Sequence, residues 1–357
     1  MKTAIIGLPM VGKTSLFTIL TGVHHETRIG ATAARTGVAK VPDPRLDELA
    51  RIFEPPKITH ATVEYVDMPA ISKENLRDAS YVASLRVVDA FAQVLRLFED
   101  ETIPHEKGSI DPRRDLEDVE TELILSDLVV VEKRLERLEK DRKKVKNPEL
   151  DHEYELLEKC KAELEQNRPL REMPLDTESE KRIRGFQFLS LKPMLYVLNL
   201  GEGDAPKLHQ REQEFREGPL ARRIQTAVTA VCGKIEAELA ELPAEEQRDY
   251  LASYGLAESG LERLISATYS LLGLMSFLTA GETEVRAWTI PVHSTAVKAS
   301  GAIHSDFEKK FIRAEVVNWK NLVDLGGYPG VRERGLLRLE GKDYIVKDGD
   351  VLVIRHG

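Results

Sequence analysis

The spacing of hydrophobic and polar residues predicts where this chain forms strands and where it forms helices. Residues 3–6 (TAII) and 194–198 (MLYVL) are short runs typical of buried strands. Residues 62–67 alternate and predict a third strand that ends at an aspartate. Residues 226–231 (TAVTAV) predict a fourth, and residues 14–22 predict a helix that a glycine ends. Strands separated by helices are typical of an α/β fold.

In the middle of the chain the spacing of apolar residues is that of long helices. Apolar residues spaced four and three apart predict a coiled-coil seam at Ile124, Leu128, Val131, Leu135 and Leu138. A returning helix is expected to use Leu150, Tyr154, Leu157, Cys160 and Leu164. Between them Pro148 interrupts the helix, and the tip is basic, with Lys140, Arg142, Lys143, Lys144 and Lys146. This hairpin tip either is solvated or contacts an RNA backbone, and the sequence leaves both open.

The last third of the chain changes character. Residues 264–280 are apolar but contain polar side chains and are short for a membrane span, so we expect a core helix. Residues 285–291 predict a strand, and residues 336–357 alternate with turns at Gly341-Lys342 and Asp348-Gly349. A small mixed α/β module fits this tail.

Composition narrows the class of protein. The 357 residues suggest two or three domains. A net charge of -9 argues against general polyanion binding. The two cysteines, Cys160 and Cys232, lie far apart and fit a reducing compartment. Gly7 and Pro9 interrupt the first apolar run, so we expect no signal peptide and a cytoplasmic protein without a membrane partner.

The segment GLPMVGKTS has the complete spacing of a phosphate-binding loop, a Gly followed four residues later by Gly-Lys-Thr. The glycines allow a tight turn that aims backbone amides at phosphate oxygens, and the following helix begins with its positive end there. Lys13 is expected to reach the β- and γ-phosphates, and the Thr14 hydroxyl to ligate Mg²⁺. The expected phosphate contacts are Gly7, Pro9, Met10, Val11, Gly12, Lys13, Thr14, Ser15 and Ala70.

A phosphate loop of this kind requires a carboxylate near the metal, and Asp67 at the end of a predicted strand supplies it. A GTPase switch reads Asp-x-x-Gly here, whereas this chain has Ala70 in the glycine position. Ile71 follows where many GTPases have a water-orienting glutamine. Because isoleucine cannot orient water, we assign no catalytic residue.

The loop after residues 194–198 indicates which base is bound. GTPases have Asn-Lys-x-Asp there, and this chain reads Asn199-Leu200-Gly201-Glu202. The longer carboxylate of Glu202 misplaces its oxygens for guanine, which favours ATP. The expected base contacts are Asn199, Leu200, Glu202, Cys232, Gly233 and Lys234.

These segments together resemble the YchF/Obg-like ATPase family of Obg-related P-loop proteins. The resemblance covers nearly the whole chain and rests on GLPMVGKTSLF, NLGE, KIEAELAEL, LLGLMSFLTAGETEVRAWTI and GAIHSDFEKKFIRAEV, among others. It implies a G-type nucleotide domain in two parts (1–118 and 185–281), an inserted antiparallel helical coiled-coil arm (119–184) and a C-terminal β-grasp TGS domain (282–357). It also implies ATP binding, slow hydrolysis and association with the ribosome or its RNA and proteins.

The chain departs from this family at several places. Relatives carry Asn where Met10 stands, and in cation-stimulated members of the wider P-loop group that Asn helps to hold a potassium ion, so we predict no K⁺ dependence. At the first switch Ala31 aligns with the Mg²⁺-binding Thr, and Thr32 is one residue away. The second switch is shorter and lacks its glycines.

We therefore expect a monomeric, divergent member of this family that binds ATP and Mg²⁺ and has weak ATPase activity in a translation-related role. One alternative is an interaction protein that binds nucleotide without hydrolysing it, because both switches are altered. Another is a true GTPase, against which Glu202 argues.

Overall fold

The computed structural model describes residues 1–23 and 34–357, and the chain divides into two compact units. The first comprises Met1–Val38 and Glu64–Leu271, and the second Ala39–Val63 and Leu272–Gly357. Residues 39–63, which we expect in the nucleotide domain, group in the structure with the C-terminal residues. Thr32 belongs to residues 24–33, which lie outside the described part.

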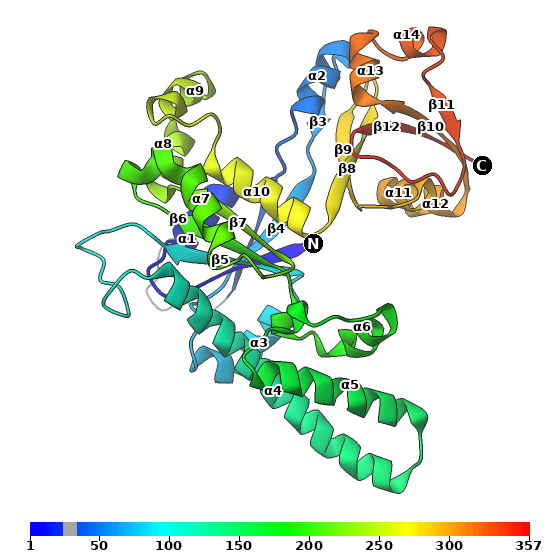
Figure 1. Ribbon diagram of the computed structural model, residues 1–357. Helices are drawn as coiled ribbons and strands as arrows, with labels where there is room; N and C mark the ends of the chain where they lie inside the picture. The colour runs from blue at the N-terminus through cyan, green and yellow to red at the C-terminus, as the bar shows by residue number, and fades with distance from the viewer. Residues whose placement is uncertain (24–33) are drawn as a thin grey trace. The chain divides into compact units, whose positions relative to one another are not determined.

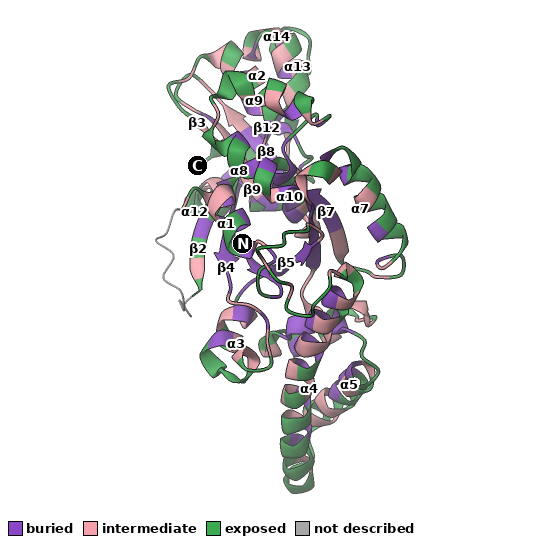
Figure 2. Ribbon diagram, turned by 90° about the vertical axis from the view of Figure 1, so that its left-hand side faces the viewer, coloured by how far each residue is buried: buried purple, intermediate pink, exposed green. Residues whose placement is uncertain are grey.

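A six-stranded sheet in the order β2-β4-β1-β5-β6-β7 forms the centre of the first unit (Figure 1). Its strands are β1 (Lys2–Ile6), β2 (Arg35–Lys40), β4 (Thr62–Asp67), β5 (Ala90–Arg96), β6 (Met194–Asn199) and β7 (Thr226–Val231). From β4 to β7 every neighbouring pair is parallel. Strands β5 and β6 are buried at every residue, and the strands at the centre of this sheet are largely purple in Figure 2. Apart from Gln93, Arg96 and Asn199 their residues are apolar, as is typical of parallel strands covered on both faces. The carboxyl ends of these parallel strands therefore meet at one edge of the sheet.

The helices of the first unit cover this sheet and form the arm. They are α1 (Lys13–Thr21), α3 (Ala79–Arg86), α4 (Pro112–Lys144), α5 (Pro148–Glu165), α6 (Thr177–Ile183), α7 (Leu208–Glu217), α8 (Gly233–Glu241), α9 (Ala244–Ser253) and α10 (Gly260–Leu271). Short 3₁₀ turns complete the unit: η1 (Asn75–Arg77), η2 (Leu170–Glu172), η3 (Arg184–Phe186), η4 (Leu189–Leu191) and η5 (Glu202–Lys207).

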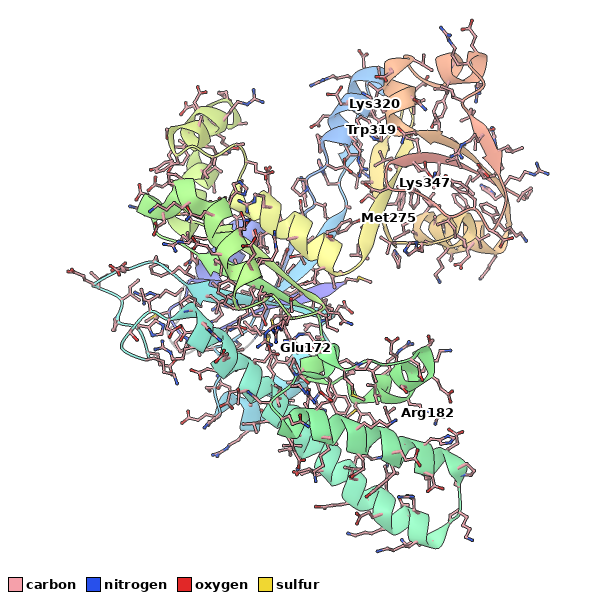
Figure 3. All side chains as sticks on the ribbon, in the orientation of Figure 1. Glu172, Arg182, Met275, Trp319, Lys320 and Lys347 are labelled. Carbon is pink, nitrogen blue, oxygen red and sulfur yellow. The ribbon has the colours of Figure 1, made fainter. Side chains whose placement is uncertain are left out.

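The expected helical arm is present and is formed by α4 and α5. Helix α4 starts at Pro112, where the Asp111 side chain accepts a hydrogen bond from the Arg114 amide. Pro148 is the first residue of α5, where its missing N–H costs nothing. The two helices pack through a buried cluster of Ile124, Val131, Leu135, Leu138, Leu156, Leu157, Cys160 and Leu164. Arg182 of α6 lies beside α5 and pairs with Glu149 (Figure 3).

The second unit contains a sheet in the order β11-β10-β12-β8-β9-β3. Its elements are α2 (Pro44–Phe53), β3 (Ile58–Thr59), β8 (Leu274–Ala280), β9 (Val285–Pro291), α11 (Ala296–Ile303), α12 (Ser305–Lys309), β10 (Phe311–Asn318), α13 (Trp319–Asp324), α14 (Tyr328–Glu333), β11 (Arg338–Glu340) and β12 (Asp350–His356). The strands expected at 285–291 and near the C-terminus are confirmed. The expected α/β fold class, with a helical arm and a C-terminal module, is confirmed as well.

One element prediction is wrong. Residues 264–280 form the end of helix α10 and then strand β8, not one core helix. Gly273 separates them with φ 63, a left-handed conformation that glycine adopts without strain. The apolar run is nearly continuous because both the end of α10 and strand β8 are largely buried. The change from helical to strand spacing of apolar residues therefore cannot be recognised in the sequence.

Candidate functional site

The segment Gly7–Ser15 leaves strand β1 and enters helix α1 at the sheet edge where the strands end. Gly7 has φ 145 and Gly12 has φ 97, so both require glycine. A Cβ on Gly7 would lie 2.7 Å from the Val94 carbonyl oxygen, and one on Gly12 would lie 2.5 Å from Asn199 Nδ2. The loop therefore lies too close to its neighbours for any side chain at these two positions.

Lys13 is the first residue of α1, and its side chain is buried within the loop. Its Nζ donates a hydrogen bond to the Leu8 carbonyl oxygen at 2.6 Å. Burial lowers the pKa of Lys13 to about 8, while the negative charges of Asp67 and Glu106 oppose that shift. A phosphate would supply the counter-charge that a buried ammonium lacks.

Thr14 and Asp67, the two residues that we expect to hold Mg²⁺, are in direct contact. Thr14 Oγ1 donates to Asp67 Oδ2 at 2.9 Å, and Asp67 Oδ1 is buried without a hydrogen-bond partner among the described residues. Burial raises the pKa of Asp67, while the hydrogen bond from Thr14 and the charge of Lys13 lower it. A hydroxyl beside an unpaired carboxylate oxygen is the hard oxygen set that Mg²⁺ prefers. The residues present therefore fit this metal.

The segment after Asp67 is fixed to the loop. The Ile71 amide donates to the Gly7 carbonyl at 3.1 Å, and the Ile71 side chain is only 3% exposed. The Ala70 carbonyl accepts from Asn75 Nδ2 at 2.7 Å. These contacts place Ala70 beside the loop and keep the Ile71 side chain in the core.

Asn199 connects the phosphate loop with the base loop. Its Nδ2 donates to the Val11 carbonyl at 3.0 Å, and its Oδ1 accepts from the Gly233 amide at 3.0 Å. The residue is only 5% exposed, so its position is well determined by packing. The amide nitrogen Nδ2 carries a second proton, which it can donate to N7 of a purine.

Glu202 and Lys234 follow strands β6 and β7 and pair with each other. Lys234 Nζ lies 2.5 Å from Glu202 Oε2, and Tyr254 donates its hydroxyl to Glu202 Oε1 at 2.8 Å. The hydrogen bond from Lys234 and then that from Tyr254 hold the pKa of Glu202 below its usual range. Sequence reasoning missed Tyr254, because it lies beyond α8 and α9 and no local pattern connects it with the base loop.

The remaining expected residues have different surroundings. Leu200 and Cys232 are buried in the core beneath the surface of the loops that follow β6 and β7. Gly233 is the first residue of α8. Pro9, Met10 and Ser15 are exposed along the phosphate loop.

The basic tip of the arm is mostly exposed. Arg142 is the exception, since it pairs with Asp151 at 2.5 Å and lies 4.3 Å from the centre of the Tyr154 ring. Within residues 1–23 and 34–357, no three His, Cys, Asp or Glu side chains gather as a metal cluster. No helix in the same ranges has the length and apolarity to cross a membrane.

Comparisons with known proteins cover the whole chain. A Haemophilus ducreyi protein named ribosome-binding ATPase YchF is 42% identical to this chain, over 99% of this chain and 98% of the relative. A Bacillus subtilis protein of the same name is 39% identical, over 99% of both chains. The solved Schizosaccharomyces pombe YchF GTPase superposes with a TM-score of 0.84 at 28% identity, covering 99% of this chain and 97% of that one. The family model YchF-GTPase_C, described as a protein of unknown function (DUF933), matches residues 274–357.

Proposed function

The chain belongs to the YchF family, and on that premise we propose that it binds ATP with Mg²⁺ and hydrolyses it slowly in association with the ribosome. One observation carries this proposal. Buried Lys13, the Thr14 hydroxyl and the unpaired oxygen of Asp67 converge at the edge where the parallel strands end. This arrangement suits a triphosphate and its metal.

Each residue has a proposed task. Lys13 binds the β- and γ-phosphates, while Gly7, Pro9, Met10, Val11, Gly12, Lys13, Thr14, Ser15 and Ala70 form the phosphate site. Thr14 and Asp67 hold Mg²⁺, with Thr32 as a third candidate. Bound Mg²⁺ neutralises phosphate charge. The base lies among Asn199, Leu200, Glu202, Cys232, Gly233 and Lys234.

Slow hydrolysis follows from what is missing around the γ-phosphate. Ile71 has no polar atom in its side chain and is buried, so it does not orient an attacking water. Its amide is already bonded to the loop at 3.1 Å, which restricts motion of the segment that follows Asp67. The site therefore binds the charged triphosphate but has no side chain at Ile71 that orients the attacking water.

The proposed partner is the ribosome, which is named in the bacterial relatives. The exposed lysines at the tip of the arm are the groups that an RNA backbone would contact. We propose that the protein acts as a cytoplasmic monomer.

Turnover of ATP tests the proposal. Replacing Asp67 by alanine removes a metal ligand and should lower turnover by about 100-fold. Asp324→Ala is the matched control, because this exposed aspartate on α13 forms only a long surface ion pair with Lys320, at 3.9 Å. Phosphate release from ATP is measured for both variants and the wild type.

The outcome also separates the alternatives. Unchanged turnover in Asp67→Ala contradicts the assignment of the metal site. ATP binding without turnover in the wild type would favour the interaction protein that binds nucleotide without hydrolysing it. Stronger competition by GTP than by ATP would favour a GTPase.

A further inference from the structure

The carboxylate expected to read the base already has two partners in this chain. Glu202 begins η5, Lys234 lies in the first turn of α8, and Tyr254 caps the end of α9. Tyr254 bonds Oε1 at 2.8 Å, and Lys234 bonds Oε2 at 2.5 Å. Each oxygen of Glu202 thus has a donor before any nucleotide is bound.

Tyr254 is the better fixed of the two donors. Its ring packs edge-on against Tyr250, with the ring centres 5.3 Å apart and the planes at 62°. Its amide bonds the Leu251 carbonyl at 3.0 Å, and the Tyr250 hydroxyl bonds Glu238. The Lys234 side chain is 66% exposed and can move away at little cost. Tyr254 therefore restrains the Glu202 carboxylate more than Lys234 does.

The chemistry of the two purines makes this arrangement selective. Guanine offers N1–H and its 2-amino group as two donors on one edge, whereas adenine offers an acceptor at N1 and a donor at its 6-amino group. Bidentate binding of guanine to Glu202 would compete with both existing hydrogen bonds. It would displace the hydroxyl of Tyr254 from a hydrogen bond to a charged group, and such a bond is stronger than an average hydrogen bond.

We propose that Tyr254 is a specificity-determining residue, whose hydrogen bond to Glu202 competes with bidentate binding of guanine and so disfavours guanine at the base site. The inference rests on the proposed nucleotide site and adds a residue to it. Asn199 does not discriminate, because N7 is an acceptor in both purines. Selection against GTP then depends on a tyrosine more than fifty positions after the loop it acts on.

Titration of the full chain with ATP and with GTP tests this role. Tyr254→Phe removes the hydroxyl and keeps the ring that packs on Tyr250. The ratio of the GTP to the ATP dissociation constant should fall by about tenfold, since one hydrogen bond to a charged group is released. The ATP dissociation constant should change by less than about twofold. Tyr154→Phe is the matched control, because this tyrosine also donates its hydroxyl to a glutamate, Glu139, at 3.4 Å, but it lies on the arm and does not bond Glu202.

The results distinguish failure of this inference from failure of the proposed function. A lower ratio in Tyr254→Phe alone supports the inference. An unchanged ratio in Tyr254→Phe, or an equal fall in both variants, overturns the role of Tyr254 while ATP binding stands. A wild-type chain that binds neither nucleotide overturns the proposed function itself.

Discussion

Met10 is the residue of the phosphate loop with the least support from its surroundings. Its side chain is 64% exposed, and its φ of 60 is a conformation that Asn adopts more easily than Met. A thioether sulfur is a weak acceptor and a poor ligand for a hard cation such as potassium. The side chain therefore offers no oxygen to a monovalent ion beside the phosphates.

We predict that potassium does not accelerate ATP turnover. Rates in KCl and NaCl at equal ionic strength should agree within about twofold, because general salt screening is then the same. The measurement is phosphate release from ATP in each salt. A clear acceleration that is specific to K⁺ would contradict this prediction.

Single residues could be predicted where a motif fixes their spacing. Lys13 and Thr14 follow Gly7 at set distances, and Asp67 ends a strand that pairs directly with β1, so the sequence was enough to propose them together. The hydrogen bond between Thr14 and Asp67 agrees with that proposal. Tyr254 could not be predicted, because its contact with Glu202 joins residues 52 positions apart through tertiary packing.

Among the elements, the arm is anchored to its unit by buried polar groups as well as by its apolar seam. Asp127 of α4 accepts hydrogen bonds from the amides of Leu189 at 2.9 Å and Ser190 at 2.7 Å. Burial raises the pKa of Asp127 to about 6, although these hydrogen bonds lower it. The η4 turn thus depends on one carboxylate for two of its buried donors.

Asp127→Ala should destabilise the first unit. Two buried amides would lose their acceptor, which should lower the free energy of unfolding by about 2–4 kcal/mol. Glu132→Ala on the same helix is the control, because its ion pair with Lys161 is exposed and 3.9 Å long. Urea unfolding followed by far-ultraviolet circular dichroism measures both. Equal midpoints for the two variants would show that Asp127 is not an anchor.

Helices and strands could be predicted where the spacing of apolar residues clearly had the period of one type and not of the other. The seam of the arm repeats over many turns, and both helices are present. The prediction of one helix at residues 264–280 was wrong because a buried helix and a buried strand are both apolar, and only Gly273 marks the boundary between them.

At the scale of the whole molecule, the phosphate site and the arm belong to the same unit. Lys107, in the loop after β5, lies 3.3 Å from Asp118 of α4, and Lys73, after Asp67, lies 4.0 Å from Glu122. Helix α4 therefore contacts both the segment after β5 and the segment after Asp67.

The order of the parts along the chain could be predicted, but their grouping in space could not. Strand β3 pairs with β9, so Ile58 aligns with Val285, and this pairing brings residues 39–63 into the second unit. A contact across more than two hundred residues leaves no local pattern in the sequence.

Calorimetric titration with Mg²⁺ and ATP of the wild type and of Lys13→Ala tests the account most directly. Lys320→Ala is the control for loss of an exposed lysine, since Lys320 pairs on the surface with Asp324. We predict saturable binding by the wild type and the control, and a loss of affinity of at least about 100-fold in Lys13→Ala, because a buried cation no longer meets the phosphates. An unchanged affinity for ATP in Lys13→Ala would contradict the assignment of this loop.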